Sequence, residues 1–269
     1  MNGRWSRLVL LLAFALSAGF MAEPAGAREK GRHRWRPTEA DRLDIQFVDH
    51  PRAGRWVTVI DVDAFDVSKR ALRKLKRRGK RVICYINAGA WENWREDADA
   101  YPARVLGKPL DGWKGERWVD IRRLDVLGPI LAARLDHCRD RAFDGVEFDN
   151  VDGWANVTGF ALTASDQLAF NRWLARQAHA RGLAVALKND LDQMAALVAD
   201  FDFAIVEECF TYHECERVRP FVDAGKPVYV VEYVRDRRLH RRWCRAARRL
   251  GVRLIFKRLS LDRWVRRCR

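Results

Sequence analysis

Strand-like and helix-like segments alternate along most of this chain, and that alternation limits the folds it can adopt. Runs of alternating or continuous apolar residues predict eight strands, at residues 44–47, 56–61, 81–86, 145–149, 184–188, 203–207, 227–232 and 253–257. Apolar residues at helical spacing predict helices at 66–78, 124–141, 165–181, 191–198, 214–223 and 239–250. Four glycines each follow a helical segment and precede a strand, where a left-handed C-cap is expected: Gly79, Gly182, Gly225 and Gly251.

Strands that alternate with helices form parallel sheets, because parallel neighbours need a crossover connection. At this length, a single closed (β/α)8 TIM barrel over residues 41–258 is the most economical α/β fold. An open doubly wound sheet is the alternative, although no glycine-rich phosphate loop follows the first strand. We also expect an extended loop after the third strand, residues 88–123, with a short strand-like run at 118–121.

The N-terminus has the features of a secretory signal peptide. Arg4 and Arg7 precede an apolar run over residues 8–20, and Ala25-Gly26-Ala27 is a plausible cleavage site. A membrane anchor is the weaker alternative, because the run is short for a bilayer and no stop-transfer pattern follows. We therefore expect a signal peptide at residues 1–27, a basic lead-in at 28–40, and a secreted or periplasmic protein.

Export allows the six cysteines to form disulfides. Cys209 and Cys215, six residues apart around a turn-like segment, are the expected pair, and Cys244 with Cys268 could form a second bridge. Two cysteines, one in an apolar strand and one late in a helix, could each remain a buried free thiol: Cys84 and Cys138. Neither the cysteines nor the six histidines have metal-site spacing, so we expect no metal and no cofactor.

Positive charge is concentrated at the C-terminal end of the chain. The net charge is +15, and residues 235–269 contain fourteen Arg, one Lys and two Asp, a net of +13. No DNA- or RNA-binding motif is present, so nucleic acid is not an expected partner of this chain, which we expect to be monomeric. The basic C-terminal segment, which ends in the Arg-rich tail 259–269, could contact an anionic cell envelope, or it could be an ordinary solvated face.

Two of the predicted strands lead directly into acidic runs at their C-terminal ends. In residues 145–154, apolar and acidic residues alternate up to Asp149, and a second run, residues 203–209, reaches Glu207 in the same way. In a barrel, the C-terminal ends of all the strands lie at one rim, where active sites form. Two carboxylates at one rim are the minimum for acid/base cleavage of a glycosidic bond.

Other polar residues are predicted at the same rim, where they would bind sugar hydroxyl or amino groups. These candidates are Asp61, Asp63, Tyr85, Asn87, Asp152, Lys188 and Glu232. The extended loop carries Trp91, Trp94, Trp113 and Trp118, and sugar rings stack well on aromatic side chains. We expect about half of these tryptophans to pack in the core, and Trp113 to contact the substrate.

Several segments, in order along the chain, match one known family. They are residues 82–89 followed by Glu92 and Arg95, Gly112-Trp113, 118–122, 143–152, 187–189, 207–210 with Cys215, and 225–228 with Glu232-Tyr233. From about Trp35 to Tyr233, the chain resembles the endo-α-1,4-polygalactosaminidases, glycoside hydrolase family 114. The resemblance implies a barrel that hydrolyses internal α-1,4 bonds of a galactosamine-containing polysaccharide. It also implies that Asp149 is the nucleophile and Glu207 the general acid/base.

Two other functions are compatible with a barrel of this kind. A carbohydrate-binding protein without turnover is one, but the presence of both Asp149 and Glu207 argues against it. A metal-dependent phosphodiesterase is the other, and it should show paired histidines near strand ends. His179 and His213 do not supply such a pair.

Overall fold

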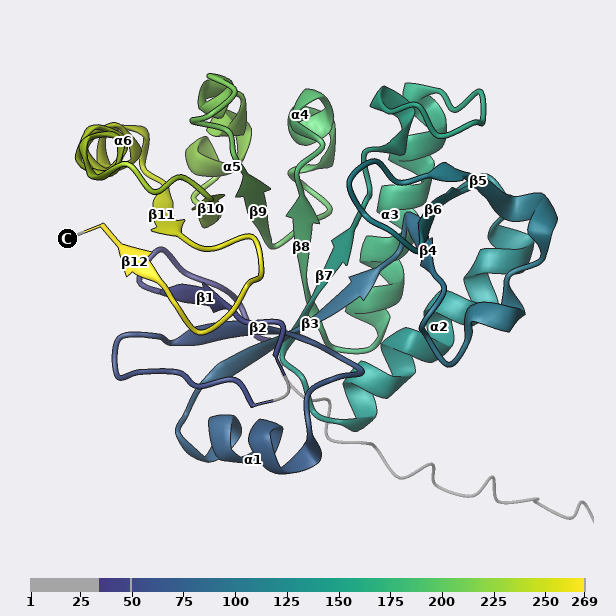
Figure 1. Cartoon of the computed structure of the whole chain (residues 1–269), viewed down its shortest axis with the longest axis horizontal. Helices are drawn as coiled ribbons and strands as arrows, with labels where there is room; N and C mark the ends of the chain where they lie inside the picture. The colour runs from purple at the N-terminus through teal and green to yellow at the C-terminus, as the bar shows by residue number, and fades with distance from the viewer. Residues whose placement is uncertain (1–33, 49, 269) are drawn as a thin grey trace, which may run out of the picture. The chain divides into compact units, whose positions relative to one another are not determined.

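The computed structural model describes residues 34–48 and 50–268, and all eight predicted parallel strands are present there (Figure 1). The strands are β1 (Leu43–Ile45), β2 (Val59–Asp63), β3 (Arg81–Asn87), β7 (Gly145–Asp149), β8 (Ala184–Lys188), β9 (Phe203–Glu207), β10 (Val228–Glu232) and β11 (Arg253–Phe256). They pair in parallel in that order and form one curled sheet. A ninth strand, β12 (Arg266–Arg267), pairs antiparallel with β11.

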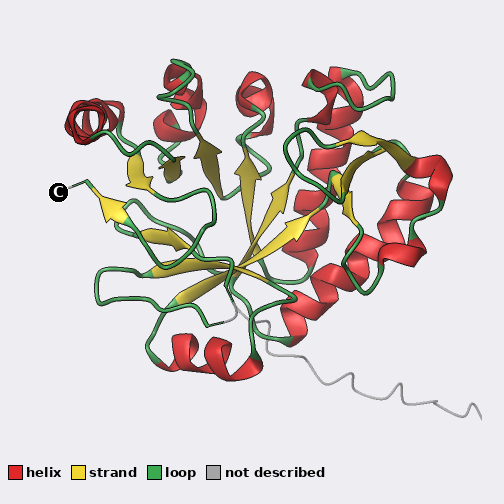
Figure 2. Ribbon diagram, viewed as in Figure 1, coloured by secondary structure: helices red, strands yellow, loops and turns green. Residues whose placement is uncertain are grey.

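Six α-helices lie on the outer side of the curled sheet (Figure 2). They are α1 (Lys69–Arg77), α2 (Leu124–Asp140), α3 (Ala164–Ala180), α4 (Met194–Leu197), α5 (Arg219–Asp223) and α6 (Arg237–Leu250). The predicted helices at 191–198 and 214–223 each begin as a 3-10 turn, Leu191–Gln193 and Cys215–Val218, before α4 and α5. The four glycines predicted at helix ends all have positive φ, from 66° to 87°, which confirms that expectation.

The sheet departs from a regular (β/α)8 barrel at the edge where its two ends meet. Within the described residues no helix separates β1 from β2 or follows β11, and β11 pairs with β12 instead of β1. Side-chain and loop contacts join the two ends: Lys257 Nζ lies 3.0 Å from Asp44 Oδ1, and the Phe47 amide donates to the Leu261 carbonyl. The structure thus establishes a curled, TIM-barrel-like sheet.

The two-residue period of a strand divides each parallel strand between two apolar layers. In β7, Val146 and Phe148 join the layer that packs against the helices, so Glu147 and Asp149 face the interior of the curled sheet. The interior layer includes Ile83, Ala186 and Ile205 from neighbouring strands, but no residue of a helix. Side chains of even and odd number in a strand therefore serve different purposes, one packing helices and the other building the interior.

The extended loop after β3 folds into a small sheet of its own. Strands β4 (Ala90–Glu92), β5 (Leu106–Pro109) and β6 (Glu116–Val119) pair antiparallel in the order β4-β6-β5, and 3-10 turns lie at Ala98–Ala100 and Ala103–Val105. Of its four tryptophans, Trp91 and Trp118 are largely buried, whereas Trp94 and Trp113 are 52% and 50% exposed. Half of them pack inward, as expected.

All six cysteines form disulfides. The predicted bridges Cys209–Cys215 and Cys244–Cys268 are both present. The expectation that Cys84 and Cys138 could be free thiols is wrong: Cys84 faces the helix layer from β3 and bonds to Cys138 of α2. Sequence spacing could not reveal this pair, because 54 residues separate its members. The predicted signal peptide lies outside the described residues, and none of the helices in residues 34–268 is long and apolar enough to span a membrane.

Candidate active site

Three neighbouring strands bring the predicted catalytic carboxylates to a shared ammonium group. Asp149 ends β7, Lys188 ends β8 and Glu207 ends β9. Lys188 Nζ lies 3.1 Å from Asp149 Oδ1 and 3.5 Å from Glu207 Oε2, and it also lies 3.2 Å from Glu147 Oε1 one layer deeper. These contacts define the carboxylate cluster: Asp149, Glu207, Glu147 and Lys188.

Two tyrosines complete the hydrogen bonding of the cluster. Tyr85 donates from its hydroxyl to Asp149 Oδ2 at 2.8 Å, and Tyr233 donates to Glu207 Oε1 at 2.5 Å. The side chain of Asn189 accepts a hydrogen bond from the Glu207 backbone amide at 2.9 Å, which fixes the end of β9. Asp149 and Glu207 are therefore each held on one side by Lys188 and on the other by a phenol, whereas Glu147 contacts Lys188 alone among these groups.

The surroundings separate the pKa values of the two carboxyls. Burial acts to raise the pKa of Asp149, but the charge of Lys188 and the hydrogen bonds from Tyr85 and Lys188 outweigh it and hold the pKa below its ordinary value. Burial raises the pKa of Glu207; Lys188 opposes this, and the negative charge of Asp149 adds to it. Burial likewise acts to lower the pKa of Lys188, yet the carboxylates around it raise that pKa well above its usual value. Asp149 therefore loses its proton at a lower pH than Glu207 does.

A hollow of about 430 Å³ opens over Asp149 and Lys188. One wall is the extended loop after β3, through residues 109–111, Trp113 and Trp118, and the other comes from the loop after β7. Burial, followed by the charge of Asp149, raises the pKa of Asp152 in this second wall to about 6. The hollow thus combines an exposed indole with carboxyl groups, a composition suited to an amino sugar.

Asn87 lies behind the wall of the hollow and holds that wall in place through hydrogen bonds. Its side chain is 1% exposed, donates to Glu116 Oε2 at 2.9 Å and accepts from the Ala90 amide and the Asn150 side chain, both at 3.0 Å. It thereby ties β3 to β6 and to the residue that follows Asp149. Burial, followed by the charges of Glu92 and Asp149, raises the pKa of Glu116 to about 7.

Three of the predicted substrate-binding residues do not line the hollow. The carboxylate of Asp63 is paired with both terminal guanidinium nitrogens of Arg95, at 3.0 and 2.7 Å. Glu232 has the even parity of the helix-facing layer and accepts from the Phe210 amide and the Thr211 hydroxyl, each at 2.7 Å. Asp61 is fully buried. Contrary to expectation, these carboxylates support the loops and the interior, while Tyr85, Asp152, Lys188 and Trp113 surround the hollow or the cluster.

Asp61 lies beneath the cluster, against Glu147. Burial, followed by the charge of Glu147, raises the pKa of Asp61 well above its ordinary value, which favours the protonated form of this carboxyl. Asparagine has the shape of a protonated aspartic acid, and we expect Asp61→Asn to keep KM and kcat within about threefold of wild type. Steady-state kinetics on the polymer checks this. A rise of KM by tenfold or more would instead mean that Asp61 contacts the substrate.

At Gly89 the chain passes very close to the residues at the end of β7 and just after it. A Cβ built at Gly89 would lie 1.6 Å from the Asn150 carbonyl oxygen, and the Gly89 and Ala88 amides both donate to the Asp149 carbonyl at 3.1 Å. Gly89→Ala must therefore displace the backbone around Asp149, and we expect kcat to fall by about 100-fold. Gly54→Ala is the matched control, because no atom lies within 4 Å of its added Cβ. An unchanged kcat in a folded Gly89→Ala protein would contradict the proposed placement of Asp149.

Sequence reasoning did not select Glu147, Glu116 or Tyr233 as site residues. Glu147 shares the interior-facing parity of Asp149, a signal that was available in residues 145–149. Tyr233 directly follows β10, where a strand-end residue is expected at the rim, but its partner Glu207 is 26 residues away in sequence. No metal-ligand group of three His, Cys, Asp or Glu side chains occurs in residues 34–48 and 50–268.

A curled parallel sheet whose strand ends bring together two carboxylates with oppositely shifted pKa values, beside a hollow lined by one of them, is the arrangement of a glycoside hydrolase. The sequence agrees, because it matches a glycoside hydrolase family over residues 24–269, nearly its whole length. The chain belongs to glycoside hydrolase family GH114.

Solved structures support the same assignment. The crystal structure of Aspergillus fumigatus Ega3 in complex with galactosamine is 32% identical in sequence, with a TM-score of 0.82, over 88% of this chain and 98% of that one. The glycoside hydrolase domain of PelA from Pseudomonas aeruginosa shares the fold at 14% identity and a TM-score of 0.66, over 84% and 97% of the two chains. An uncharacterized protein of Deinococcus radiodurans is 26% identical over 213 residues, which is 70% of this chain and 67% of that one.

Proposed function

We propose that this protein is a secreted endo-glycosidase that cleaves internal α-1,4 bonds of a galactosamine-containing polysaccharide. The observation that carries the proposal is the contact of Asp149 and Glu207 with the same ammonium group of Lys188, beside which the pKa of Asp149 is lowered and burial raises that of Glu207. Glycoside hydrolysis needs one carboxyl of such a pair ionised and the other protonated. The GH114 family membership gives the reaction class independently.

In the first step, an Asp149 oxygen attacks the anomeric carbon while the Glu207 proton moves to the departing glycosidic oxygen. The bond from the anomeric carbon to that oxygen breaks, and the sugar becomes esterified to Asp149. In the second step, Glu207 takes a proton from water, whose oxygen attacks the same carbon and releases Asp149. Once Asp149 is esterified, its negative charge no longer raises the pKa of Glu207, so the ionised form of Glu207, which this step needs as a base, is favoured.

The geometry favours a retaining course over an inverting one. The two distances from Lys188 Nζ, 3.1 Å to Asp149 Oδ1 and 3.5 Å to Glu207 Oε2, allow at most 6.6 Å between these oxygens. Retaining enzymes place their carboxyl groups about 5–5.5 Å apart, whereas inverting enzymes need about 6.5–9.5 Å to admit a water molecule.

An amino sugar fits the composition of the hollow. Asp111 and Asp152 line it and would attract a sugar ammonium, while the half-exposed ring of Trp113 offers a stacking surface for the C–H face of a pyranose. The relative Ega3 was crystallised with galactosamine, which supports the same sugar class for this chain. In this proposal Asp63, Asn87 and Glu232 hold the loops that form the hollow and do not contact the sugar.

The disulfides and the fold are both consistent with this function. Three disulfides within the described residues are consistent with an oxidising compartment, and so with secretion. The fold is a (β/α)8-type barrel in which β12 and the Lys257–Asp44 pair take the place of a β11–β1 ladder.

The proposal is tested with purified protein and a panel of α-1,4-linked galactosamine polymers that differ in N-acetylation. We expect oligosaccharides of several lengths to appear early from at least one polymer, because an endo-enzyme cuts internal bonds, and we expect the anomeric configuration to be retained by NMR. Release of monosaccharide alone would contradict internal cleavage. Binding without any cleavage across the panel would replace the enzyme by a carbohydrate-binding protein.

A further inference from the structure

A second and larger hollow lies along the edge of the sheet where β11 pairs with β12 instead of β1. Its walls are α6, β11 and β12, with Arg42 and Trp56 on the far side. The volume of about 2160 Å³ is more than twice the upper end of the range for small-molecule sites, about 300–1,000 Å³. We call it the basic groove, and its size suits a segment of a polymer.

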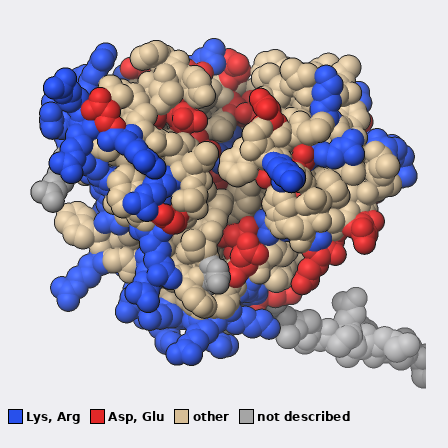
Figure 3. Space-filling model, viewed as in Figure 1, with Lys and Arg blue, Asp and Glu red and all other residues tan. Residues whose placement is uncertain are grey.

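The charged residues of the basic groove are all cationic. Its lining within the described residues holds no Asp or Glu, and it contains Arg42, Arg235, Arg237, Arg241, Arg245, Arg248, Arg253, Lys257, Arg258, Arg266 and Arg267. Figure 3 shows Lys and Arg gathered along the left edge of the molecule, where Figure 1 places α6. Mutual repulsion of so many like charges disfavours the compact state, and an anionic ligand would relieve it.

Part of this charge is neutralised internally and part is free. Lys257 pairs with Asp44, and Arg258 pairs with Asp262. By contrast, Arg237, Arg241 and Arg245 recur every four residues along one face of α6, are exposed, and have no hydrogen bond or ion pair to other described residues. These three exposed guanidinium groups, on one face of the helix, are free to bind an anion from solution.

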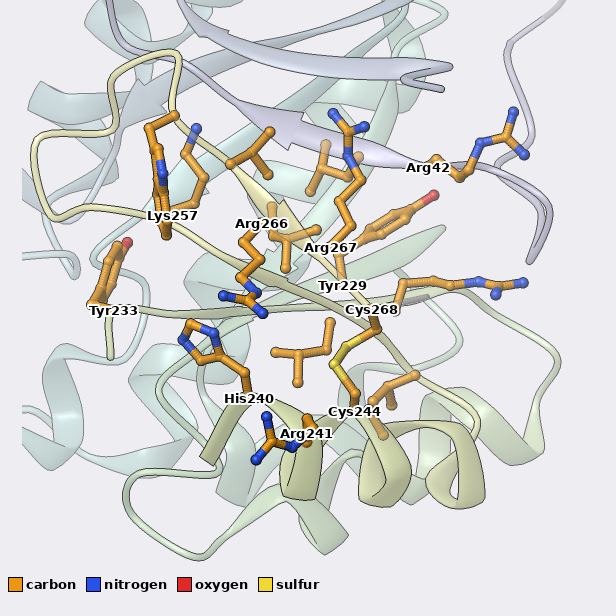
Figure 4. A pocket seen from close by; sticks show the side chains of 18 of the residues that line it. Arg42, Tyr229, Tyr233, His240, Arg241, Cys244, Lys257, Arg266, Arg267 and Cys268 are labelled. Carbon is orange, nitrogen blue, oxygen red and sulfur yellow. A yellow bond between two sulfur atoms is a disulfide. The ribbon is translucent and has the colours of Figure 1, made fainter. Parts of the chain in front are cut away.

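The wall of the basic groove opposite α6 includes β12, which is fixed in place. The lining also contains buried polar atoms without a hydrogen-bond partner. β12 is held by its pairing with β11 and by the Cys244–Cys268 disulfide to α6. Figure 4 shows Arg266 and Arg267 from β12 and Arg241 from α6 around one space, with that disulfide at its side. Nε of Arg267 and the hydroxyl of Tyr229, both in the lining, are buried without a hydrogen-bond partner. Such atoms are costly unless a ligand or water satisfies them.

We propose that the basic groove binds a carboxylate-bearing polysaccharide, alongside the glycan that the enzyme cuts. Guanidinium groups bind carboxylates through two parallel hydrogen bonds, and the 67% exposed ring of Trp56 at the edge offers a stacking surface for a sugar. Tyr233 lines the groove and also donates to Glu207, so the groove begins next to the carboxylate cluster. A chain bound there would keep the enzyme within a mixed glycan matrix. This binding does not depend on the proposed cleavage.

The test measures binding of a polyuronate, with neutral dextran and duplex DNA as comparisons, by calorimetry at 50 and 150 mM salt. The decisive variant is Arg241→Gln/Arg245→Gln, and its matched control is Arg242→Gln/Arg249→Gln, which removes the same charge from α6 outside the groove lining. We expect the groove variant to weaken polyuronate binding by at least about tenfold and the control by less than about twofold, with no binding of dextran.

Three outcomes would overturn the proposal. Equal losses in both variants would mean unspecific attraction to a charged helix, and absence of polyuronate binding at 150 mM salt would mean no site. Tighter binding of DNA than of polyuronate through Arg241 and Arg245 would identify a nucleic-acid surface instead. Asp149→Asn should leave polyuronate binding unchanged, so failure of the cleavage proposal and failure of this one can be told apart.

Discussion

Replacement of Asp149 by asparagine is expected to lower kcat/KM on the galactosamine polymer by at least about 10³-fold, or about 4 kcal/mol of transition-state stabilisation. The amide cannot form the covalent bond to the anomeric carbon, and it no longer provides the negative charge that Lys188 and Tyr85 stabilise in wild type. Initial rates of reducing-end release measure the loss. Added azide should restore part of the turnover of Asp149→Ala, because the shorter side chain leaves space in which this small anion can attack the same carbon.

The control for this prediction is Asp152→Asn, a second carboxyl in the lining of the same hollow. We expect a change mainly in KM there, of about tenfold, because Asp152 is placed to bind the sugar rather than to attack it. Unfolding temperatures within a few degrees of wild type establish that both variants are folded. If Asp149→Asn retained a tenth of the activity, Asp149 would not be the nucleophile, and another carboxyl of the cluster would have to take its place.

The strands of this protein could be predicted from the sequence because apolar periodicity is local. The predictions for β7, β8 and β9 coincide with the observed bounds, and these strands carry Asp149, Lys188 and Glu207. The period of two also fixes which side chains share a face. The carboxylates at the ends of β7 and β9 could be paired because the C-terminal ends of parallel strands lie at one rim.

What the sequence could not predict depends on partners that are distant along the chain. Asp63 stands at a strand end like Asp149, but Arg95, 32 residues later, pairs with it and removes it from the rim. Glu232 was misassigned for a different reason: its parity in β10 turns it toward the loop after β9, where Phe210 and Thr211 use both of its oxygens. Position at a strand end therefore selects candidate site residues. Their parity in the strand and their partners far along the sequence decide which candidates lie in the site.

Glutamine at position 207 is expected to lower kcat/KM on the polymer by about 10³-fold while largely sparing an aryl glycoside that carries an acidic phenol. The sugar hydroxyl released from the polymer is a poor leaving group and needs the Glu207 proton, whereas an acidic phenol departs without one. kcat/KM reports only the steps up to the first bond cleavage. The need for Glu207 as a base in the second step therefore does not affect this comparison. Comparable losses on both substrates would contradict an acid role for Glu207 and point to a structural one.

The pH dependence of wild-type kcat/KM on the polymer follows from the same two groups. Activity needs Asp149 ionised, so it rises as pH passes the pKa of Asp149, which lies below the ordinary 3.8. It also needs Glu207 protonated, so it falls as pH rises past the pKa of Glu207, which lies above the ordinary 4.5. We therefore expect a bell-shaped profile with an acidic optimum, whose two limbs belong to the coupled pair as a whole.

The descending limb identifies which carboxyl is the acid. Two other carboxyls near the hollow also have raised pKa values, Asp152 with one of about 6 and Glu116 with one of about 7. If Glu207 is the proton donor, the residual activity of Glu207→Gln on the polymer loses its descending limb, while Asp152→Asn and Glu116→Gln keep theirs on the same substrate. A limb that persists in Glu207→Gln and disappears in one of the other two variants would transfer the acid role to that residue. The donor is thus assigned by which substitution removes the titration, independently of how much activity each variant loses.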